Sequence, residues 1–220
     1  MGAREDIQTE LVSAGQVFEL ETVSVHGNLL RVFKNAPRTL GEVWLTASKR
    51  GDIPYLIFDD VVMTFSEADK QVRSLAAWLQ AQGIQQGDRV AVGMRNYPEW
   101  IFAFNAATSI GAIAVAMNSL WLSEEMEFGL KDSGAKVLFA DQERLDRLAP
   151  VRESLDLEVI SVRATNKAAN TSALEDLLAG EVSTLLPDFD IDPGDPATIL
   201  YTSGSTGHPK GAVSCHRNIV

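Results

Sequence analysis

The sequence predicts an α/β fold, with a doubly wound and largely parallel sheet and flanking helices. Short, almost continuous apolar runs at residues 89–94, 112–117 and 136–140 have the composition of strands that are buried on both faces of a sheet. Stretches with helical spacing or helix-start signals separate these runs. Strands and helices that alternate at this spacing are typical of a parallel sheet covered by helices on both faces.

Composition and charge restrict the class of protein. With 220 residues, of which 45% are hydrophobic and 22% charged, the chain is long enough for one large or two small globular domains. Its 19 basic and 30 acidic residues give a net charge of −11, which argues against a nucleic-acid partner because phosphate backbones require a basic face. The single cysteine, Cys215, cannot form an internal disulfide and fits a reducing compartment, so we expect a cytoplasmic protein.

We expect neither a signal peptide nor a transmembrane segment. Residues 1–6 contain two acidic side chains and no apolar stretch. Residues 101–122 carry no charged side chain and are long enough to span a membrane, but several polar residues interrupt them and Gly111 divides them. We interpret this segment as a helix followed by a buried strand.

Residues 1–65 contain local signals for a strand, a helix and a hairpin. Residues 1–38 give only a short predicted strand near 19–25. Thr39 and Glu42 form a capping-box pattern that predicts a helix to about residue 49. Residues 53–58 and 61–65 predict a hairpin around an acidic two-residue turn.

The clearest predicted helix begins at a second capping box, Thr64 with Glu67, and ends near Gly83. Its apolar residues follow the spacing of one helix face. They are Ala68, Val72, Leu75, Ala76 and Leu79.

The alternation continues in the second half of the chain. Pro98 is predicted to begin a helix that ends near residue 109, and Ser123 to cap a helix that Gly134 ends. The remaining expected elements are strands at 112–117, 136–140 and 157–162, helices at 142–148 and 172–179, and a surface loop at 163–171.

A stretch rich in proline and aspartate, residues 187–196, is interpreted as a connector. It divides the chain into an N-terminal segment with little signal (1–38), an α/β subdomain (39–186) and the beginning of a second subdomain (197–220). Asp192 and Asp195 are interpreted as turn formers, so we predict no metal-binding residues.

The stretch with the clearest chemistry is residues 201–211, Tyr-Thr-Ser-Gly-Ser-Thr-Gly-His-Pro-Lys-Gly. Its glycines allow successive N–H groups to point into one concavity, its hydroxyls add donors, and Lys210 adds a positive charge. We interpret it as a polyphosphate-binding loop, with a plain turn or linker as the alternative. The patterns G-x-x-x-x-G-K-S/T and G-x-G-x-x-G do not fit: counting from Gly204, Pro209 takes the place of the second glycine of the first pattern.

The loop resembles, position for position, the signature of the adenylate-forming superfamily, which includes acyl-CoA synthetases, peptide-synthetase adenylation domains and luciferases. The stretch 114–119 favours acyl-CoA synthetases over peptide synthetases, although Ala116 departs from the proline common to both groups. Other stretches resemble the same family in the same order, so that the likeness covers about residues 40–219: 64–67, 87–92, 111–119 and 132–136.

The resemblance implies a two-step ligase. A carboxylic acid such as a fatty acid attacks the α-phosphate of ATP to give an acyl-adenylate and pyrophosphate, and the thiol of CoA then displaces AMP. The implied cofactors are therefore ATP, Mg²⁺ and CoA, with Mg²⁺ bridging the phosphates and Lys210 supporting their charge. The residues that the resemblance assigns to the β- and γ-phosphates are Thr202, Ser203, Gly204, Ser205, Thr206 and Gly207.

The resemblance also implies that the catalytic residues lie beyond Val220. The block that binds adenine and Mg²⁺, the ribose-binding aspartate, the hinge and the adenylation lysine do not occur in these 220 residues, so we expect the chain alone not to form an acyl-adenylate. Two alternatives stay open: a catalytically silent nucleotide- or phosphate-binding module, and another adenylate-forming enzyme such as a peptide-synthetase adenylation domain.

Three further residues are interpreted as structural. The acyl pocket is expected mostly beyond Val220, so Trp121 and Phe128 are interpreted as core aromatics. His216 lies where a helix would begin and has no partner in the sequence for acid–base chemistry, so we interpret it as a cap or a loop support.

Overall fold

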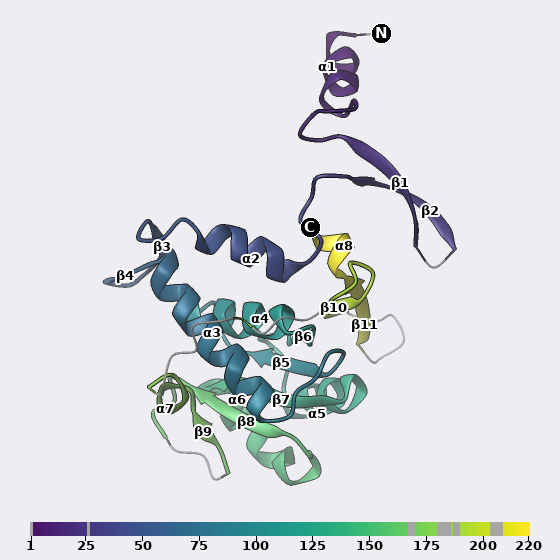
Figure 1. The fold of residues 1–220 in the computed structure, drawn as a ribbon. Helices are drawn as coiled ribbons and strands as arrows, with labels where there is room; N and C mark the ends of the chain where they lie inside the picture. The colour runs from purple at the N-terminus through teal and green to yellow at the C-terminus, as the bar shows by residue number, and fades with distance from the viewer. Residues whose placement is uncertain (1, 26, 167–169, 180–185, 187–189, 203–208) are drawn as a thin grey trace.

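The computed structural model describes residues 2–25, 27–166, 170–179, 186, 190–202 and 209–220 (Figure 1). Within these residues the main sheet contains seven strands in the order β11-β10-β6-β5-β7-β8-β9. Neighbouring strands are parallel, except that β10 and β11 are antiparallel. The predicted α/β fold with a largely parallel sheet is therefore confirmed. The strands are β5 (Arg89–Gly93), β6 (Ile113–Ala116), β7 (Ala135–Asp141), β8 (Glu158–Val162), β9 (Ser172–Ala173), β10 (Pro196–Thr202) and β11 (Lys210–Cys215).

Helices cover both faces of this sheet. Alternate residues of one strand reach opposite cores: Val90 and Val92 of β5 belong to one buried cluster, and Ala91 belongs to the other. Strands buried on both faces carry such continuous apolar runs. The first face is covered by α2 (Leu40–Ser48), α3 (Phe65–Ala81), α4 (Pro98–Ser109) and α7 (Leu174–Leu178), and the second by α5 (Ser123–Ser133) and α6 (Gln142–Leu148), which the 3-10 helix η1 (Ala149–Ser154) follows.

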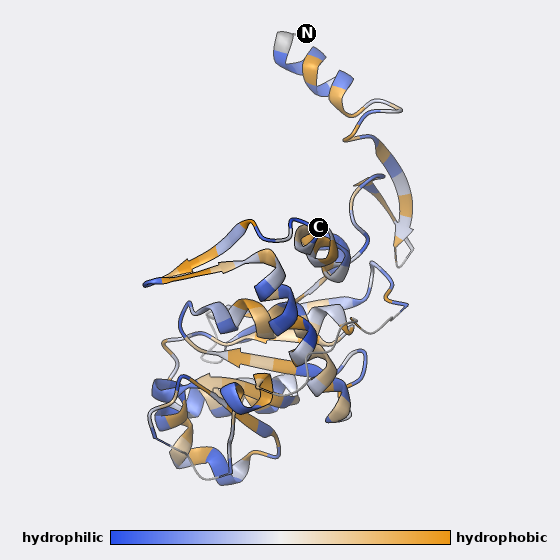
Figure 2. Ribbon diagram, turned by 60° about the vertical axis from the view of Figure 1, so that its left-hand side comes forward, coloured by the Kyte–Doolittle hydropathy of each residue, from blue (hydrophilic) through white to orange (hydrophobic). Residues whose placement is uncertain are grey.

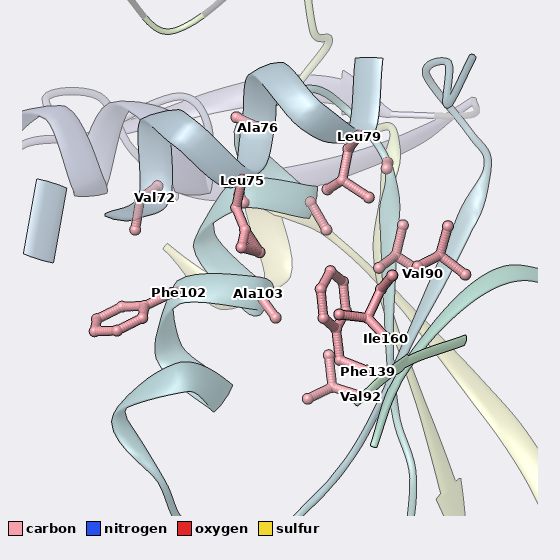
Figure 3. Close-up of a cluster of buried hydrophobic side chains, with 14 of the residues drawn as sticks. Val72, Leu75, Ala76, Leu79, Val90, Val92, Phe102, Ala103, Phe139 and Ile160 are labelled. Carbon is pink, nitrogen blue, oxygen red and sulfur yellow. The ribbon is translucent and has the colours of Figure 1, made fainter. Parts of the chain in front are cut away.

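Helix α3 confirms the clearest sequence prediction. The hydroxyl of Thr64 accepts a hydrogen bond from the backbone N–H of Glu67 at 3.2 Å, and the Glu67 carboxylate accepts one from the backbone N–H of Thr64 at 2.8 Å. All five predicted apolar residues of this helix are completely buried. Figure 3 shows Leu79 on the side of the sheet residues Val90 and Phe139, whereas Val72 and Leu75 lie above Phe102 and Ala103 of the neighbouring helix α4.

Among the described residues, two hairpins lie outside the main sheet. The hairpin of β3 (Pro54–Phe58) and β4 (Val61–Thr64) was predicted, and its turn holds Asp59 at a left-handed φ of 50°. The N-terminal segment forms α1 (Ala3–Leu11) and a hairpin of β1 (Leu20–Val25) and β2 (Asn28–Phe33). Figure 1 shows this segment at a distance from the sheet. The strand near residues 19–25 is confirmed, whereas α1 and β2 were not predicted.

Helix starts differ from the predictions in two places. Leu122, not Ser123, is the N-cap of α5, because the backbone N–H of Leu122 donates to the Glu125 carboxylate at 3.0 Å. The Ser123 hydroxyl instead donates to the carbonyl of Arg147 at 2.6 Å. The predicted helix at 172–179 is also wrong in its first turn, because Ser172–Ala173 pairs with β8 as strand β9.

The capping box predicted at Thr39 is half formed. Thr39 caps α2 by accepting from the N–H of Glu42 at 3.2 Å, but the Glu42 carboxylate accepts from the N–H of Arg38 at 2.6 Å, outside the helix.

The apolar segment 101–122 divides as expected. Helix α4 ends at Ser109, Gly111 follows with a left-handed φ of 73°, and β6 begins at Ile113. Within the described part of the chain, the helices are all too short or too polar to cross a bilayer. Figure 2 shows the apolar residues of the main sheet enclosed between its helices.

The segment assigned from the sequence to a second subdomain contributes to the main sheet. β10 pairs with β6, and β11 extends the sheet beyond β10 to its edge. Here the same sheet continues through residues 196–215, past the predicted connector.

Candidate functional site

Strands β10 and β11 enclose the predicted phosphate loop. In their antiparallel register Tyr201 faces Gly211 and Thr202 faces Lys210, and the Thr202 hydroxyl donates to the Lys210 carbonyl at 3.4 Å. The last residue of β10 and the first residue of β11 are therefore directly paired. Two of the predicted site residues, Thr202 and Lys210, lie in these strands. The other five lie outside the described residues: Ser203, Gly204, Ser205, Thr206 and Gly207.

β10 ends on the side of the sheet formed by the carboxyl ends of the parallel strands, where ligands commonly bind. β10 runs parallel to β6, with Thr198 opposite Ala114 and Leu200 opposite Ala116, so both strands end at the same edge. Open α/β sheets bind ligands outside the carboxyl ends of their strands. Lys210 is exposed at this edge, and no acid among the described residues forms an ion pair with it. Its ammonium group is thus available to an anionic ligand.

Tyr201, the last residue before Thr202, is anchored on helix α5. Its hydroxyl donates to the Asp132 carboxylate at 2.7 Å and lies 3.2 Å from the carbonyl of Gly129. Its ring meets the Trp121 ring edge to face, with 5.2 Å between centroids. Burial, together with the adjacent Asp132 carboxylate, raises the pKa of the Tyr201 hydroxyl, which therefore stays protonated as a donor. Trp121 is buried, as predicted.

A second set of contacts joins the carboxyl ends of β5 and β7. The Asp141 carboxylate accepts from the backbone N–H of Arg95 at 2.9 Å, from the backbone N–H of Arg144 at 3.1 Å and from the Arg144 guanidinium at 3.1 Å. The Arg144 and Asp141 side chains are only 3% and 5% exposed. Since α4 and α6 follow β5 and β7 onto opposite faces, these groups occupy the point at which the winding of the sheet reverses.

Arg144 and a second arginine of α6, Arg147, hold the loop between β6 and α5. The Arg147 guanidinium donates to the carbonyls of Ser119 at 2.8 Å and Trp121 at 3.0 Å, and the Arg144 guanidinium also donates to Ser119. Glu143 pairs with Arg147 and Arg95. The guanidinium groups near Glu143, that of Arg95 first, lower the pKa of its carboxyl, which keeps the network charged. The network thereby fixes the backbone that carries Trp121, the ring neighbour of Tyr201.

The aspartates of the connector form turns, as predicted. The Asp192 carboxylate accepts from the N–H of Gly194 at 2.7 Å, and Asp195 accepts from the N–H of Asp192 at 2.9 Å and from the Gln86 amide at 2.8 Å. Across the described ranges, no group of three or more His, Cys, Asp or Glu side chains is arranged to hold a metal ion.

His216 has the structural role that the sequence indicated. It is completely buried, and its Nδ1 accepts a hydrogen bond from the backbone N–H of Leu40 at 3.1 Å. Its own backbone N–H donates to the carbonyl of Asp195 at 3.2 Å. These contacts join the first turn of α2 to the beginning of α8 (His216–Ile219).

Sequence reasoning did not find Asp132, Asp141, Arg144 or Arg147 as neighbours of the site. Arg144 and Asp141 are three residues apart, which is compatible with pairing on one helix turn, but nothing local indicates that Arg144 also reaches Ser119. Tyr201 and Asp132 are 69 residues apart, and only the fold brings them together.

Comparison with known proteins identifies the family of this chain. The model of the family AMP-binding enzyme matches residues 43–220. The chain is 30% identical over 157 residues to 4-coumarate–CoA ligase 3 of Arabidopsis thaliana, covering 71% of this chain and 28% of that protein. It is 32% identical over 170 residues to the long-chain-fatty-acid–CoA ligase FadD13 of Mycobacterium tuberculosis, covering 73% and 31%.

The fold is also that of a solved ligase. The crystal structure of the anthranilate CoA ligase AuaEII in complex with anthranoyl-AMP superposes with a TM-score of 0.78 at 24% identity, over 84% of this chain and 36% of that one. The chain spans less than a third of the length of the two curated relatives. The family match over residues 43–220 establishes that the chain belongs to the AMP-binding enzymes, the adenylate-forming superfamily.

Proposed function

We propose that the full-length protein is an ATP-dependent acid–thiol ligase of the acyl-CoA synthetase type. The observation that carries this proposal is the paired position of Thr202 and Lys210 at the carboxyl edge of the sheet, at the two ends of a loop rich in glycine and hydroxyl residues. A loop of this composition offers N–H and O–H donors and one cation to a polyphosphate. In this proposal residues 202–207 hold the β- and γ-phosphates of ATP, and Lys210 neutralises their charge.

The proposed reaction has two displacements. A carboxylate oxygen of the acid attacks the α-phosphorus, a new O–P bond forms, and the bond to pyrophosphate breaks. The thiolate of CoA then attacks the acyl carbon of the adenylate, and AMP leaves with the electron pair of the broken C–O bond. Holding the polyphosphate in line with the acid and neutralising its charge is the contribution proposed for the loop.

We assign no residue of this chain to Mg²⁺. The described residues offer no cluster of ligating side chains, and we propose that the ion would enter with ATP and would neutralise part of the phosphate charge. The groups that perform adenylation are proposed to lie beyond Val220. The chain of 220 residues is therefore expected to be inactive alone.

The acid is proposed to be a fatty acid, with an aromatic acid as the alternative. The names of the relatives support both classes, because one is a long-chain-fatty-acid–CoA ligase and the other a 4-coumarate–CoA ligase. We further propose a cytoplasmic location, which the lone Cys215 and the use of ATP and CoA support. Residues 197–220 are proposed to lead into a second subdomain of the full-length protein.

Exchange of labelled pyrophosphate into ATP, catalysed by the full-length protein, tests the first displacement. The protein is given a panel of fatty, aromatic and amino acids, and thioester formation with CoA is then measured for each acid that supports exchange. We expect exchange with a fatty or aromatic acid and formation of its CoA thioester. Substitutions Lys210→Met and Thr206→Val are expected to weaken ATP binding and exchange, whereas Thr9→Val serves as a control on α1, which Figure 1 shows apart from β10 and β11.

Three outcomes would overturn the proposal. ATP binding without exchange for any acid would indicate a silent nucleotide-binding module. Exchange with amino acids but no CoA thioester would indicate an enzyme of the peptide-synthetase type. Unchanged ATP affinity in both loop variants would indicate that the loop is only a linker.

A further inference from the structure

The ring of Tyr201 lies next to Gly211 and Trp121. Opposite Tyr201 in the register stands Gly211, where a Cβ atom would lie 3.4 Å from the Tyr201 ring and 3.0 Å from Ile199. Trp121 meets the same ring edge to face. Trp121 itself lies so close to α5 that a Cβ on Gly129 would be 2.4 Å from its Cζ3 atom. The absence of a side chain at Gly211 and at Gly129 therefore leaves room for Tyr201 and Trp121, which meet edge to face.

The hydroxyl of Tyr201 reaches the last turn of α5. It donates to Asp132 at 2.7 Å, the shorter of its two contacts, and a hydrogen bond to an ionised acceptor is stronger than one between neutral groups. Asp132 lies at the exposed surface of this last turn. A hydrogen bond thus joins the carboxyl end of β10 to helix α5, which packs on the sheet.

This hydrogen bond lies next to Thr202 and Lys210, the two described residues of the proposed phosphate site. Thr202 follows Tyr201 directly, and its register partner is Lys210. β11 is an edge strand, so beyond it no strand among the described residues holds Lys210 in place. The Thr202 hydroxyl bonds only within the hairpin of β10 and β11, to the Lys210 carbonyl. Among the described residues, the hydrogen bond from Tyr201 to Asp132 therefore joins this end of the hairpin to helix α5.

We propose that the hydrogen bond from Tyr201 to Asp132 positions Thr202 and Lys210 for the phosphates of ATP. The inference rests on the proposed function and deepens it, because it assigns two positioning residues to the phosphate site. Neither residue is expected to touch the reacting atoms. Loss of the bond lets the end of β10 shift on α5, which misplaces the Thr202 hydroxyl and the Lys210 ammonium together.

Four variants of the full-length protein separate this role from simple packing. Tyr201→Phe keeps the ring and removes the donor, and Asp132→Ala removes the acceptor. Asp132→Asn keeps an oxygen that can accept the bond. Tyr55→Phe is the matched control, because Tyr55 stacks on Phe65 in the other core, away from β10. The measurements are the affinity for ATP by titration calorimetry without acid or CoA, the KM for ATP and for the acid, kcat, and the melting temperature.

We expect Tyr201→Phe and Asp132→Ala each to weaken ATP binding and raise the KM for ATP about fivefold, the factor that corresponds to about 1 kcal/mol. The KM for the acid stays unchanged. The double variant Tyr201→Phe/Asp132→Ala is expected to bind ATP no more weakly than either single variant, because each substitution removes the same hydrogen bond. Asp132→Asn stays within about twofold of the wild-type protein, and Tyr55→Phe leaves the ATP affinity unchanged.

The inference is overturned if Tyr201→Phe binds ATP as the wild-type protein does, or if Asp132→Asn is as weak as Asp132→Ala. A lower melting temperature with unchanged ATP affinity would likewise show a role in stability alone. Because ATP affinity is measured without acid, a protein that binds ATP but catalyses no exchange contradicts the proposed ligase activity and leaves this test intact. Asp132 is exposed, so its variants are expected to fold even where Tyr201→Phe does not.

Discussion

Nδ1 of His216 accepts a hydrogen bond from the backbone N–H of Leu40, across 176 residues of sequence. The N–H groups in the first turn of a helix have no partner within the helix. His216 supplies one for α2 and is itself completely buried. Since Nδ1 accepts, the buried imidazole is neutral and carries its proton on Nε2. The end of the described chain therefore holds the beginning of its first core helix in place.

Replacement of His216 should separate the contribution of its hydrogen bond to Leu40 from that of the packing of its ring. His216→Ala removes the acceptor and leaves a cavity, and we expect the free energy of unfolding to fall by about 2–4 kcal/mol. His216→Asn places an amide oxygen near the position of Nδ1 and should cost less. Denaturation in urea at neutral pH measures both values. Equal losses in the two variants would show that packing, and not the bond to Leu40, determines the stability.

The same residue makes stability depend on pH. Burial lowers the pKa of His216 below its usual 6.5, against the smaller opposing effect of Asp195. The unfolded chain therefore takes up a proton near pH 6.5 that the folded protein resists, so the free energy of unfolding decreases as the pH falls below this value. The slope due to this group approaches about 1.4 kcal/mol per pH unit and vanishes above the unfolded pKa.

Urea denaturation between pH 5 and pH 7.5 checks this dependence. We expect His216→Asn to flatten the pH profile below pH 6.5 and to leave its slope above that pH unchanged, because asparagine does not titrate. A variant that keeps the wild-type slope below pH 6.5 would assign the dependence to other groups.

The buried pair of Arg144 and Asp141 should be far more sensitive than an exposed one. Arg144→Met leaves the Asp141 carboxylate, whose side chain is 5% exposed, without its cation, and we expect a loss of roughly 3–5 kcal/mol. Lys136→Met is the control, because Lys136 pairs with Asp88 while its side chain is 52% exposed. That change should cost less than about 1 kcal/mol. Similar losses of unfolding free energy in the two variants would contradict this difference.

Thr64 should contribute to stability through its hydroxyl. Thr64→Ala removes the acceptor that caps α3, and we expect the free energy of unfolding to fall by about 1 kcal/mol. Thr64→Ser retains the hydroxyl and should stay close to the wild-type value in the same denaturation experiment. A serine variant as unstable as the alanine variant would show that the methyl group of Thr64, and not its cap, matters.

Local signals predicted those elements whose determinants lie close together in the sequence. Thr64 and Glu67 are three residues apart, and the apolar face of α3 repeats within one helix, so α3 was predicted correctly. Strand β9 depends on pairing with β8, and its two residues carry no signal of their own. Helix α1 follows Gly2, which offers no side chain as a cap, and its Ile7 and Leu11 are exposed.

The same distinction applies to the candidate site. The composition of residues 201–211 predicted the loop, and the hairpin register of Thr202 and Lys210 is consistent with that prediction. The partners of its ends could not be predicted, since Tyr201 meets Asp132 only because β10 lies beside β6 and α5 follows β6. Ser123 was given the wrong role because its hydroxyl has a distant acceptor, the carbonyl of Arg147.

Replacement of Gly129 by alanine should destabilise the protein, whereas the same replacement within an exposed helix usually stabilises it. In an exposed helix, Gly→Ala stabilises by up to about 1 kcal/mol. Here the new Cβ would lie 2.4 Å from the Trp121 ring, a rigid group that must move as a whole. We therefore expect Gly129→Ala to lower the free energy of unfolding by about 1–3 kcal/mol and to shift the tryptophan fluorescence.

The double variant Gly129→Ala/Trp121→Leu tests the cause of this loss. A leucine at position 121 frees the space that the methyl group needs, so adding Gly129→Ala to Trp121→Leu should cost little further stability, although Trp121→Leu alone is destabilising. Denaturation of the four proteins gives the coupling energy between the two positions. If the costs of the two substitutions simply add, the close approach of Trp121 to Gly129 does not limit the stability of α5.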